Sequence, residues 1–223
     1  DYSRIQGLCI SPSNEIIITG NFLGQLDMDS SANQQLLNQQ GDSSAIFVAA
    51  YTSTGQCLWS EQIGSLNTRC RVNDIVCSIN QYYYITGSFQ SSIDFDVGNG
   101  QSILTSVSSN DDAFVLKLKS PGQFDWVRQL GGNGVDEGIS ISVNPNEYAM
   151  VAGSFSDVVD FGINTTSDWH QSAGGLDGFL VTLNANGTYH EGAQCSGLGD
   201  EVVKAVCHDN AHSIYTTGDF FQT

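Results

Sequence analysis

The sequence has few positively charged residues. Lys and Arg together number 7 among 223 residues, against 24 Asp and Glu, and the formal net charge is −17 at pH 7. A charge of this sign repels the phosphate backbone of nucleic acids and the anionic surface of membranes. We therefore expect neither nucleic acid nor a membrane surface as a partner, and the acidic residues keep the chain soluble or attract cations and basic proteins.

Long apolar runs and catalytic motifs are also missing. No run approaches the roughly 20 apolar residues of a membrane-spanning helix, and no signal peptide is apparent at the first residues. The motifs of serine hydrolases, zinc proteases, phosphate-binding loops and dinucleotide-binding folds do not occur. We predict no membrane span, no enzymatic activity and no cofactor other than a calcium ion, whose candidate site is described below.

Proline is scarce, with 3 residues, whereas glycine is abundant, with 24. Four of the glycines lie in similar tetrapeptides that recur every 65 to 67 residues. The four are Thr19-Gly20-Asn21-Phe22, Thr86-Gly87-Ser88-Phe89, Ala152-Gly153-Ser154-Phe155 and Thr217-Gly218-Asp219-Phe220. A fixed spacing of this length indicates a repeat architecture.

Each repeat has the pattern of four short strands. One hairpin lies around an Asn-containing turn just before the repeated glycine, and a second lies around Gly55, Gly122 or Gly187. Several strands are apolar on consecutive residues, which is typical of sheets covered on both faces. We predict an all-β fold of β-propeller blades with four antiparallel strands each. One propeller region would contain units at about 1–67, 68–133 and 134–200, followed by a half unit at 201–223.

The second unit carries a family resemblance. Thr86-Gly87-Ser88-Phe89 is followed by Ile93-Asp94-Phe95-Asp96, by Asp112-Ala113-Phe114-Val115 and by Trp126 to Gly132. This series resembles the SBBP β-propeller repeat; the third unit keeps much of it, and the first has Ala45 where the others have Asp. The resemblance implies a propeller, usually in exported or surface proteins, and implies no single activity.

The number of repeats is low for a closed propeller, which typically has four to eight blades. We expect either a segment of a longer protein or an open array whose ends are covered by another copy. The predicted function is an extracellular or cell-surface structural or interaction module, such as a segment of a filament or matrix assembly. The alternative is a carbohydrate- or calcium-binding propeller of an exported protein.

Six cysteines occur without a Cys-x-x-Cys motif, which favours disulfides in a secreted protein over a metal site. We predict the pairs Cys70–Cys77 and Cys195–Cys207, with Cys9 and Cys57 paired or bonded outside the chain, although other connectivities are open. Cys207 shares its strand position with Cys9 and, within one residue, Cys77. A zinc site of Cys195, Cys207, His208 and His212 is the less favoured interpretation.

Other residues are candidates for modification or ligand contact. Sequons at Asn164 and Asn186 predict N-glycosylation. Asp94, Asp96 and Asn99 form an oxygen-rich loop that suggests calcium, although such residues more often stabilise turns.

The repeated Asp and Trp residues have structural interpretations. Asp112 and Asp177 recur at one position per repeat, and we expect them to accept hydrogen bonds from the backbone rather than to perform catalysis. Trp59 and Trp126 also recur, and we expect both in the core between blades. Trp169 lies outside the repeated pattern and is therefore a candidate contact residue for a ligand.

Overall fold

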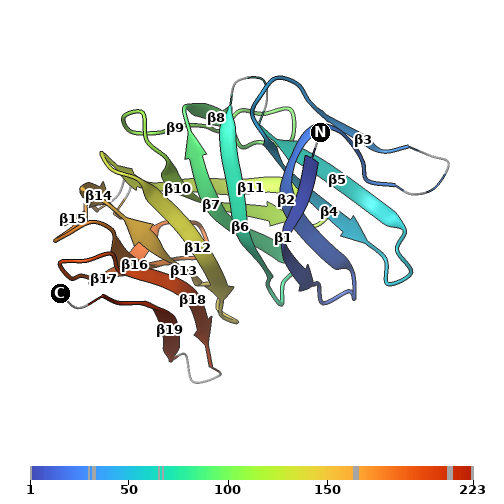
Figure 1. The fold of residues 1–223 in the computed structure, drawn as a ribbon. Coiled ribbons are helices and arrows are strands. Elements are labelled where there is room, and N and C mark those ends of the chain that lie inside the picture. Colours follow the sequence, from blue (N-terminus) through green and yellow to red (C-terminus); the bar gives the residue numbers. More distant parts are fainter. Residues whose placement is uncertain are drawn as a thin grey trace.

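The computed structural model describes residues 2–29, 31, 34–64, 66, 68–162, 166–209 and 213–221. Within these residues the regular elements are all strands, and each strand pairs with its neighbours in antiparallel orientation (Figure 1). The sheets follow one another as an open fan of propeller blades (Figure 1). The predicted all-β propeller fold of three full units and a half unit is confirmed. No helix in this part of the chain is long and apolar enough to cross a membrane.

Each full unit forms a sheet of four main strands in chain order, and the half unit forms a hairpin. The main strands are β1 (Tyr2–Ile10), β2 (Ile16–Asp27), β4 (Ala45–Tyr51) and β5 (Cys57–Ile63); β6 (Arg69–Cys77), β7 (Tyr82–Gln90), β10 (Asp112–Lys119) and β11 (Gln123–Gly132); β12 (Asp136–Val143), β13 (Ala149–Phe155), β16 (Asp177–Leu183) and β17 (Tyr189–Cys195); and β18 (Val202–His208) with β19 (Ile214–Asp219).

A short additional hairpin lies between the second and third main strands of each full unit, and the sequence pattern did not predict it. Its strands are β3 (Leu36–Gln39) with the end of β2, β8 (Ser92–Asp94) with β9 (Ile103–Thr105), and β14 (Val158–Asp160) with β15 (Trp169–Gln171). The β14–β15 hairpin also pairs with β11 and so extends the second sheet. Gly132 permits this close approach, because an added Cβ would lie 1.8 Å from the carbonyl oxygen of Val158.

The first strand of every unit contains a β-bulge at the same repeat position. The register shifts between Ile5 and Gly7, and it shifts at the corresponding places in β6, β12 and β18. The extra residue in β6 is Asn73, whose side-chain amide donates to the carbonyl oxygen of Gly138 at 2.8 Å. The bulge therefore turns a polar side chain toward the next unit.

Apolar side chains fill the space between adjacent sheets. Trp59 packs on Tyr83 of the second unit with ring centroids 5.6 Å apart. Trp126 packs on Tyr84 of its own sheet at 6.0 Å and donates through Nε1 to the Ala185 carbonyl of the third unit at 3.0 Å. Both tryptophans are almost completely buried. The expectation that these repeated aromatic residues form the core between blades is confirmed.

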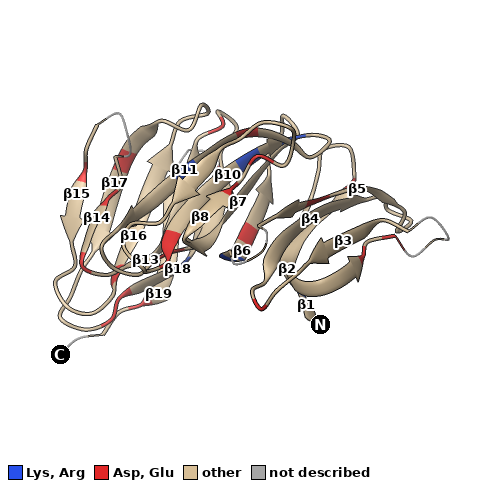
Figure 2. Ribbon diagram, turned by 90° about the horizontal axis from the view of Figure 1, so that it is seen from above, with Lys and Arg blue, Asp and Glu red and all other residues tan. Residues whose placement is uncertain are grey.

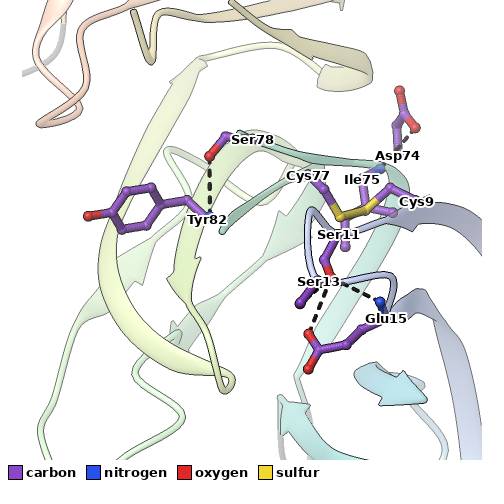
Figure 3. Close-up of a disulfide and its surroundings, with 9 residues drawn as sticks. All are labelled: Cys9, Ser11, Ser13, Glu15, Asp74, Ile75, Cys77, Ser78 and Tyr82. Carbon is purple, nitrogen blue, oxygen red and sulfur yellow. Dashed lines mark hydrogen bonds between the residues drawn. A yellow bond between two sulfur atoms is a disulfide. The ribbon is translucent and has the colours of Figure 1, made fainter. Parts of the chain in front are cut away.

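The structure contains one disulfide, and it is not one of the predicted pairs. Cys9 of β1 is bonded to Cys77 of β6, so the bond links the first two units beside the β1–β2 turn (Figure 3). The prediction of Cys70–Cys77 is wrong, because both residues lie on β6. Seven residues of extended strand separate their Cα atoms by roughly 23 Å, far beyond disulfide reach.

The other predicted pairs are also wrong. Cys195 ends the fourth strand of the third sheet, whereas Cys207 lies on β18, which packs mainly against the first two strands of that sheet. Cys57 lies on the far strand of the first sheet and donates its thiol hydrogen to Gln35 Oε1 at 3.2 Å. These cysteines and Cys70 are free thiols.

Candidate interaction surfaces

The first strand of each unit presents an apolar side chain at the same repeat position. These residues are Leu8, Ile75, Ile141 and Val206, each twelve residues before its repeated glycine. Ile75, Ile141 and Val206 are 4%, 4% and 7% exposed because each strand packs on the preceding unit, whereas Leu8 on β1 is 58% exposed. Leu8 therefore presents to solvent the surface that its counterparts bury between units.

Two more residues of β1 extend this surface. Ile5 is 58% exposed, although its counterparts Val72 and Val203 are completely buried. Ile10 is also exposed, at the end of the same strand. Ile5, Leu8 and Ile10 together are called the β1 face below. In every later unit the corresponding face is covered by the preceding sheet.

The opposite end of the fan has the complementary exposure. Tyr215 on β19 is 55% exposed, whereas its counterparts Ile17, Tyr84 and Met150 are at most 2% exposed. Those counterparts pack with Ile75, Ile141 and Val206 of the next unit. Tyr215 thus lies on the side of its unit that, in the earlier units, packs against the first strand of the next unit.

Polar groups on β19 extend the same side. Asp219 corresponds to Asn21, whose amide donates to the Cys70 carbonyl at 2.9 Å and whose Oδ1 accepts from the Val72 N–H at 3.2 Å. Both of these bonds cross to the next unit. Tyr215, Thr217 and Asp219 are called the β19 face below. Across the whole molecule, acidic residues are widely scattered and basic residues are few (Figure 2).

A separate groove lies over β11, between the additional hairpins of the second and third units. Its volume is about 420 Å³, and Leu104, Arg128, Asp160 and Trp169 are among the lining residues. Trp169 is 63% exposed. The candidate contact residue predicted from its place outside the repeat therefore stands at the edge of the groove on β15.

A hydrogen-bond network in the third unit lies next to Trp169 in the sequence. His170 lies 3.0 Å from Asp168 Oδ2 through Nε2 and 3.0 Å from Gln194 Oε1 through Nδ1. Tyr189 also donates to Asp168. Burial opposes ionisation of Asp168, but the hydrogen bonds from Tyr189 and His170 outweigh it and lower the pKa of the carboxyl. The sequence pattern did not predict this network, although His170 beside Trp169 departs from the repeat and was the available signal.

The calcium candidates occupy a turn whose oxygens already accept backbone hydrogen bonds. Asp94 Oδ1 accepts from the N–H groups of Asp96 and Ser102 at 3.1 and 2.8 Å, and Asp96 Oδ1 accepts from Gly98. Asn99 lies in the same loop. The corresponding Asp residues of the other units organise their hairpin loops in the same way. Among the described residues, no group of three or more His, Cys, Asp or Glu is placed to hold a metal ion.

The remaining candidates lie apart from one another. His208 Nδ1 is 2.8 Å from Ser142 Oγ, and His212 is outside the described residues. Asn186 is exposed in the turn between β16 and β17, where its Oδ1 accepts from the N–H of Thr188. Asn164 lies outside the described residues. Glycosylation of both sequons remains a prediction.

Comparisons with known proteins agree with the repeat fold. No family model matches the chain. A protein of Acanthamoeba polyphaga mimivirus, described as an uncharacterized WD repeat-containing protein, is 24% identical over 183 residues. The alignment covers 72% of this chain and 13% of the viral protein, so the chain matches a small part of that relative. The fold and this similarity together support a β-propeller-type repeat, and the more specific SBBP resemblance remains a prediction.

Proposed function

We propose that the chain is a protein-interaction module whose β1 face binds the β19 face of a second copy, forming a linear assembly. The observation that carries this proposal is the paired exposure of Leu8 and Tyr215, whose counterparts are buried against each other's strands in every internal junction. Two different faces that fit each other make a head-to-tail contact, which propagates unless it closes into a ring.

The chemistry of the two faces supports this pairing. The first internal junction combines an apolar centre with polar bonds from Asn21, and the exposed faces offer apolar residues and, at Asp219, a hydrogen-bond acceptor. Exposed apolar sheet surfaces of this kind mark protein contacts. The repeat-propeller relative favours an interaction role over an enzymatic one.

The experiment is a measurement of assembly size with two single variants. Leu8→Asp disables the β1 face and leaves the β19 face intact, and Tyr215→Asp does the reverse. We expect the unmodified chain to form concentration-dependent oligomers in analytical ultracentrifugation and each variant alone to remain a monomer. Mixing the two variants restores one productive contact and yields dimers only. Leu58→Asp is a control, because Leu58 is exposed on the last strand of the first sheet, away from both faces.

Two outcomes contradict the proposal. One is a monomer at every concentration, and the other is a mixture of the two variants that stays monomeric. Electron microscopy of the native material adds a test of the assembly itself, since isolated discs without a longitudinal repeat argue against a filament.

An extracellular or cell-surface location is part of the same proposal. The Cys9–Cys77 disulfide supports it, because such bonds persist in oxidising compartments. The exposed sequon at Asn186 is accessible to the glycosylation machinery. Intact mass before and after enzymatic deglycosylation tests it, and an unchanged mass with fully reduced cysteines counts against this location.

A second candidate function is carbohydrate binding at the groove beside Trp169. An exposed tryptophan next to polar side chains is a suitable stacking surface for a sugar ring. Binding on a glycan array that disappears in Trp169→Ala favours this function, whereas an array without binding leaves the groove with no support as a sugar site.

A further inference from the structure

Two junctions between units contain pairs of completely buried acidic residues. Asp112 begins β10 and Asp136 begins β12, and both are 0% exposed. Asp177 and Glu201 occupy the corresponding positions at the next junction, with exposures of 0% and 3%. Buried carboxyl groups are rare in proteins unless a partner compensates for their lost hydration.

The backbone places the two acids of each pair next to each other. The N–H of Asp136 donates to the carbonyl oxygen of Asp111 at 2.8 Å, beside Asp112. At the following junction, the N–H of Glu201 donates to the carbonyl oxygen of Leu176 at 2.7 Å, beside Asp177. The same main-chain bond therefore joins the strands that carry each pair.

The hydrogen-bond partners of the first pair satisfy only half of its oxygens. Asp112 Oδ2 accepts from the N–H of Val107 at 2.9 Å and from the Gln129 amide, and Asp136 Oδ2 accepts from the N–H of Gly132 at 2.8 Å. The Oδ1 atoms of Asp112 and Asp136 are buried without a hydrogen-bond partner among the described residues.

The second pair repeats this arrangement. Asp177 Oδ2 accepts from the N–H of Ala173 at 3.1 Å and from the Gln194 amide at 2.6 Å. Asp177 Oδ1 and Glu201 Oε2 are buried without a partner in the described part of the chain. One unpaired oxygen on each acid, at two equivalent junctions, points to a group shared between the members of each pair.

The charges around the first pair are negative. Asp111 acts on Asp112 and is itself held by Arg71 at 2.7 Å, while Asp157 acts on Asp136. Burial raises the pKa of Asp112 to about 6 and that of Asp136 to about 8, and the charge of Asp112 contributes to the second increase. A proton is therefore favoured at this site near neutral pH.

We propose that Asp112 and Asp136 hold one shared proton that joins the second and third units of the native protein. The protonated carboxyl donates to the unpaired oxygen of its partner, so one proton satisfies both acids. Loss of that proton leaves two adjacent buried charges, and the junction weakens. The first junction has Ala45 and Cys70 at these positions and lacks this dependence on pH.

The sign of the pH effect follows from the raised pKa of Asp136. Between the ordinary aspartate value and about 8, the native protein keeps a proton that the unfolded chain has released. The stability that this proton contributes is fully present below the unfolded value and is lost as the pH rises through about 8.

The experiment combines denaturant unfolding with infrared spectroscopy on the full chain. We expect the free energy of unfolding to fall between about pH 4 and about pH 8 and to level off above that, with a slope that corresponds to the release of about one proton. Asp136→Asn keeps the size of the side chain but cannot ionise, so it removes about one proton from that slope. The native infrared spectrum at neutral pH contains a protonated-carboxyl band that this variant reduces. The control Asp42→Asn changes an exposed acid and keeps the slope and the band.

Asp112→Asn gives an independent measurement at the same junction if Asp136→Asn does not fold. Variants that retain the full slope and the full band overturn the proposal. So does stabilisation by calcium chloride, relative to EDTA, that the unmodified chain shows and the variants lack, because the pair then binds a cation instead of a proton.

Discussion

At the first junction between units, Ala45 and Cys70 occupy the positions that Asp112 and Asp136 take at the second. The Cys70 Sγ lies 3.8 and 3.6 Å from the carbonyl oxygens of Ser44 and Ile63, either of which can accept its single hydrogen, so it needs no ionisable partner. The first junction also carries the Cys9–Cys77 disulfide, which the later junctions do not have among the described residues.

This difference separates what the repeat requires from what it tolerates. All four units share the bulge in the first strand, and the internal junctions share the apolar contact at the Leu8-type position. The two positions that hold the acidic pair at the later junctions hold an alanine and a cysteine at the first. Backbone register and apolar packing therefore define the junction, whereas the buried polar groups adjust its response to pH and oxidation.

The largest expected effect comes from placing half of the acidic pair in the first junction. Ala45→Asp introduces a buried carboxyl beside Cys70, where no partner compensates for it. We expect a loss of about 3–5 kcal/mol in the free energy of unfolding at neutral pH, measured by urea denaturation.

The matched variant completes the pair. Ala45→Asp with Cys70→Asp supplies two acids that can share a proton, so we expect it to recover part of the loss below about pH 6. A double variant that is no more stable than Ala45→Asp at any pH indicates that the first junction cannot adopt the geometry of the others.

The second effect comes from removing the crosslink. Cys9→Ser opens a disulfide that spans 68 residues of sequence. The loss of loop closure in the unfolded chain predicts a decrease of about 2–4 kcal/mol in the free energy of unfolding. Cys207→Ser is the control, since that thiol is exposed and unbonded. Equal stability of the two variants contradicts a structural role for the bond.

The repeat made the fold predictable, because four strands per unit follow from glycine spacing and apolar runs. It did not reveal the disulfide, since sequence gives no distance between strands of different units. The shared position of Cys9, Cys77 and Cys207 was the usable signal, because first strands of consecutive units pack side by side. The additional hairpins were missed because their strands have only three or four residues.

For the candidate sites as well, the sequence did not reveal which side chains meet across a junction. Asp112 and Asp177 accept backbone hydrogen bonds as predicted, yet their second oxygens and their partners Asp136 and Glu201 became visible only in the assembled junction. Trp169 was recognised because it departs from the repeat. An open end at the first unit was part of the sequence prediction, but Leu8 was not singled out, because its strand resembles those of its buried counterparts.

A third test replaces the two acids of the second junction with the residues found at the first junction. Asp112→Ala with Asp136→Cys reproduces the Ala45 and Cys70 arrangement, and we expect this variant to fold under reducing conditions. Its free energy of unfolding should vary less between about pH 4 and about pH 8 than that of the unmodified chain, by a slope that corresponds to about one proton. An unchanged slope assigns the pH dependence to other groups.

The smallest expected effect concerns thiol reactivity and leaves stability unchanged. Cys207 is exposed, whereas Cys70 is completely buried and burial raises its pKa to about 12. Because only the thiolate reacts, Cys70 has roughly a thousandfold less reactive form than an ordinary thiol at mildly alkaline pH. An alkylating reagent followed by peptide mapping should modify Cys207 first and Cys70 last. Cys70 becomes accessible only when the first junction opens, so its rate of modification should increase in Cys9→Ser. A rate for Cys70 that equals that of Cys207 in the oxidised protein contradicts a closed first junction, and a rate that does not change in Cys9→Ser shows that the disulfide does not control its opening.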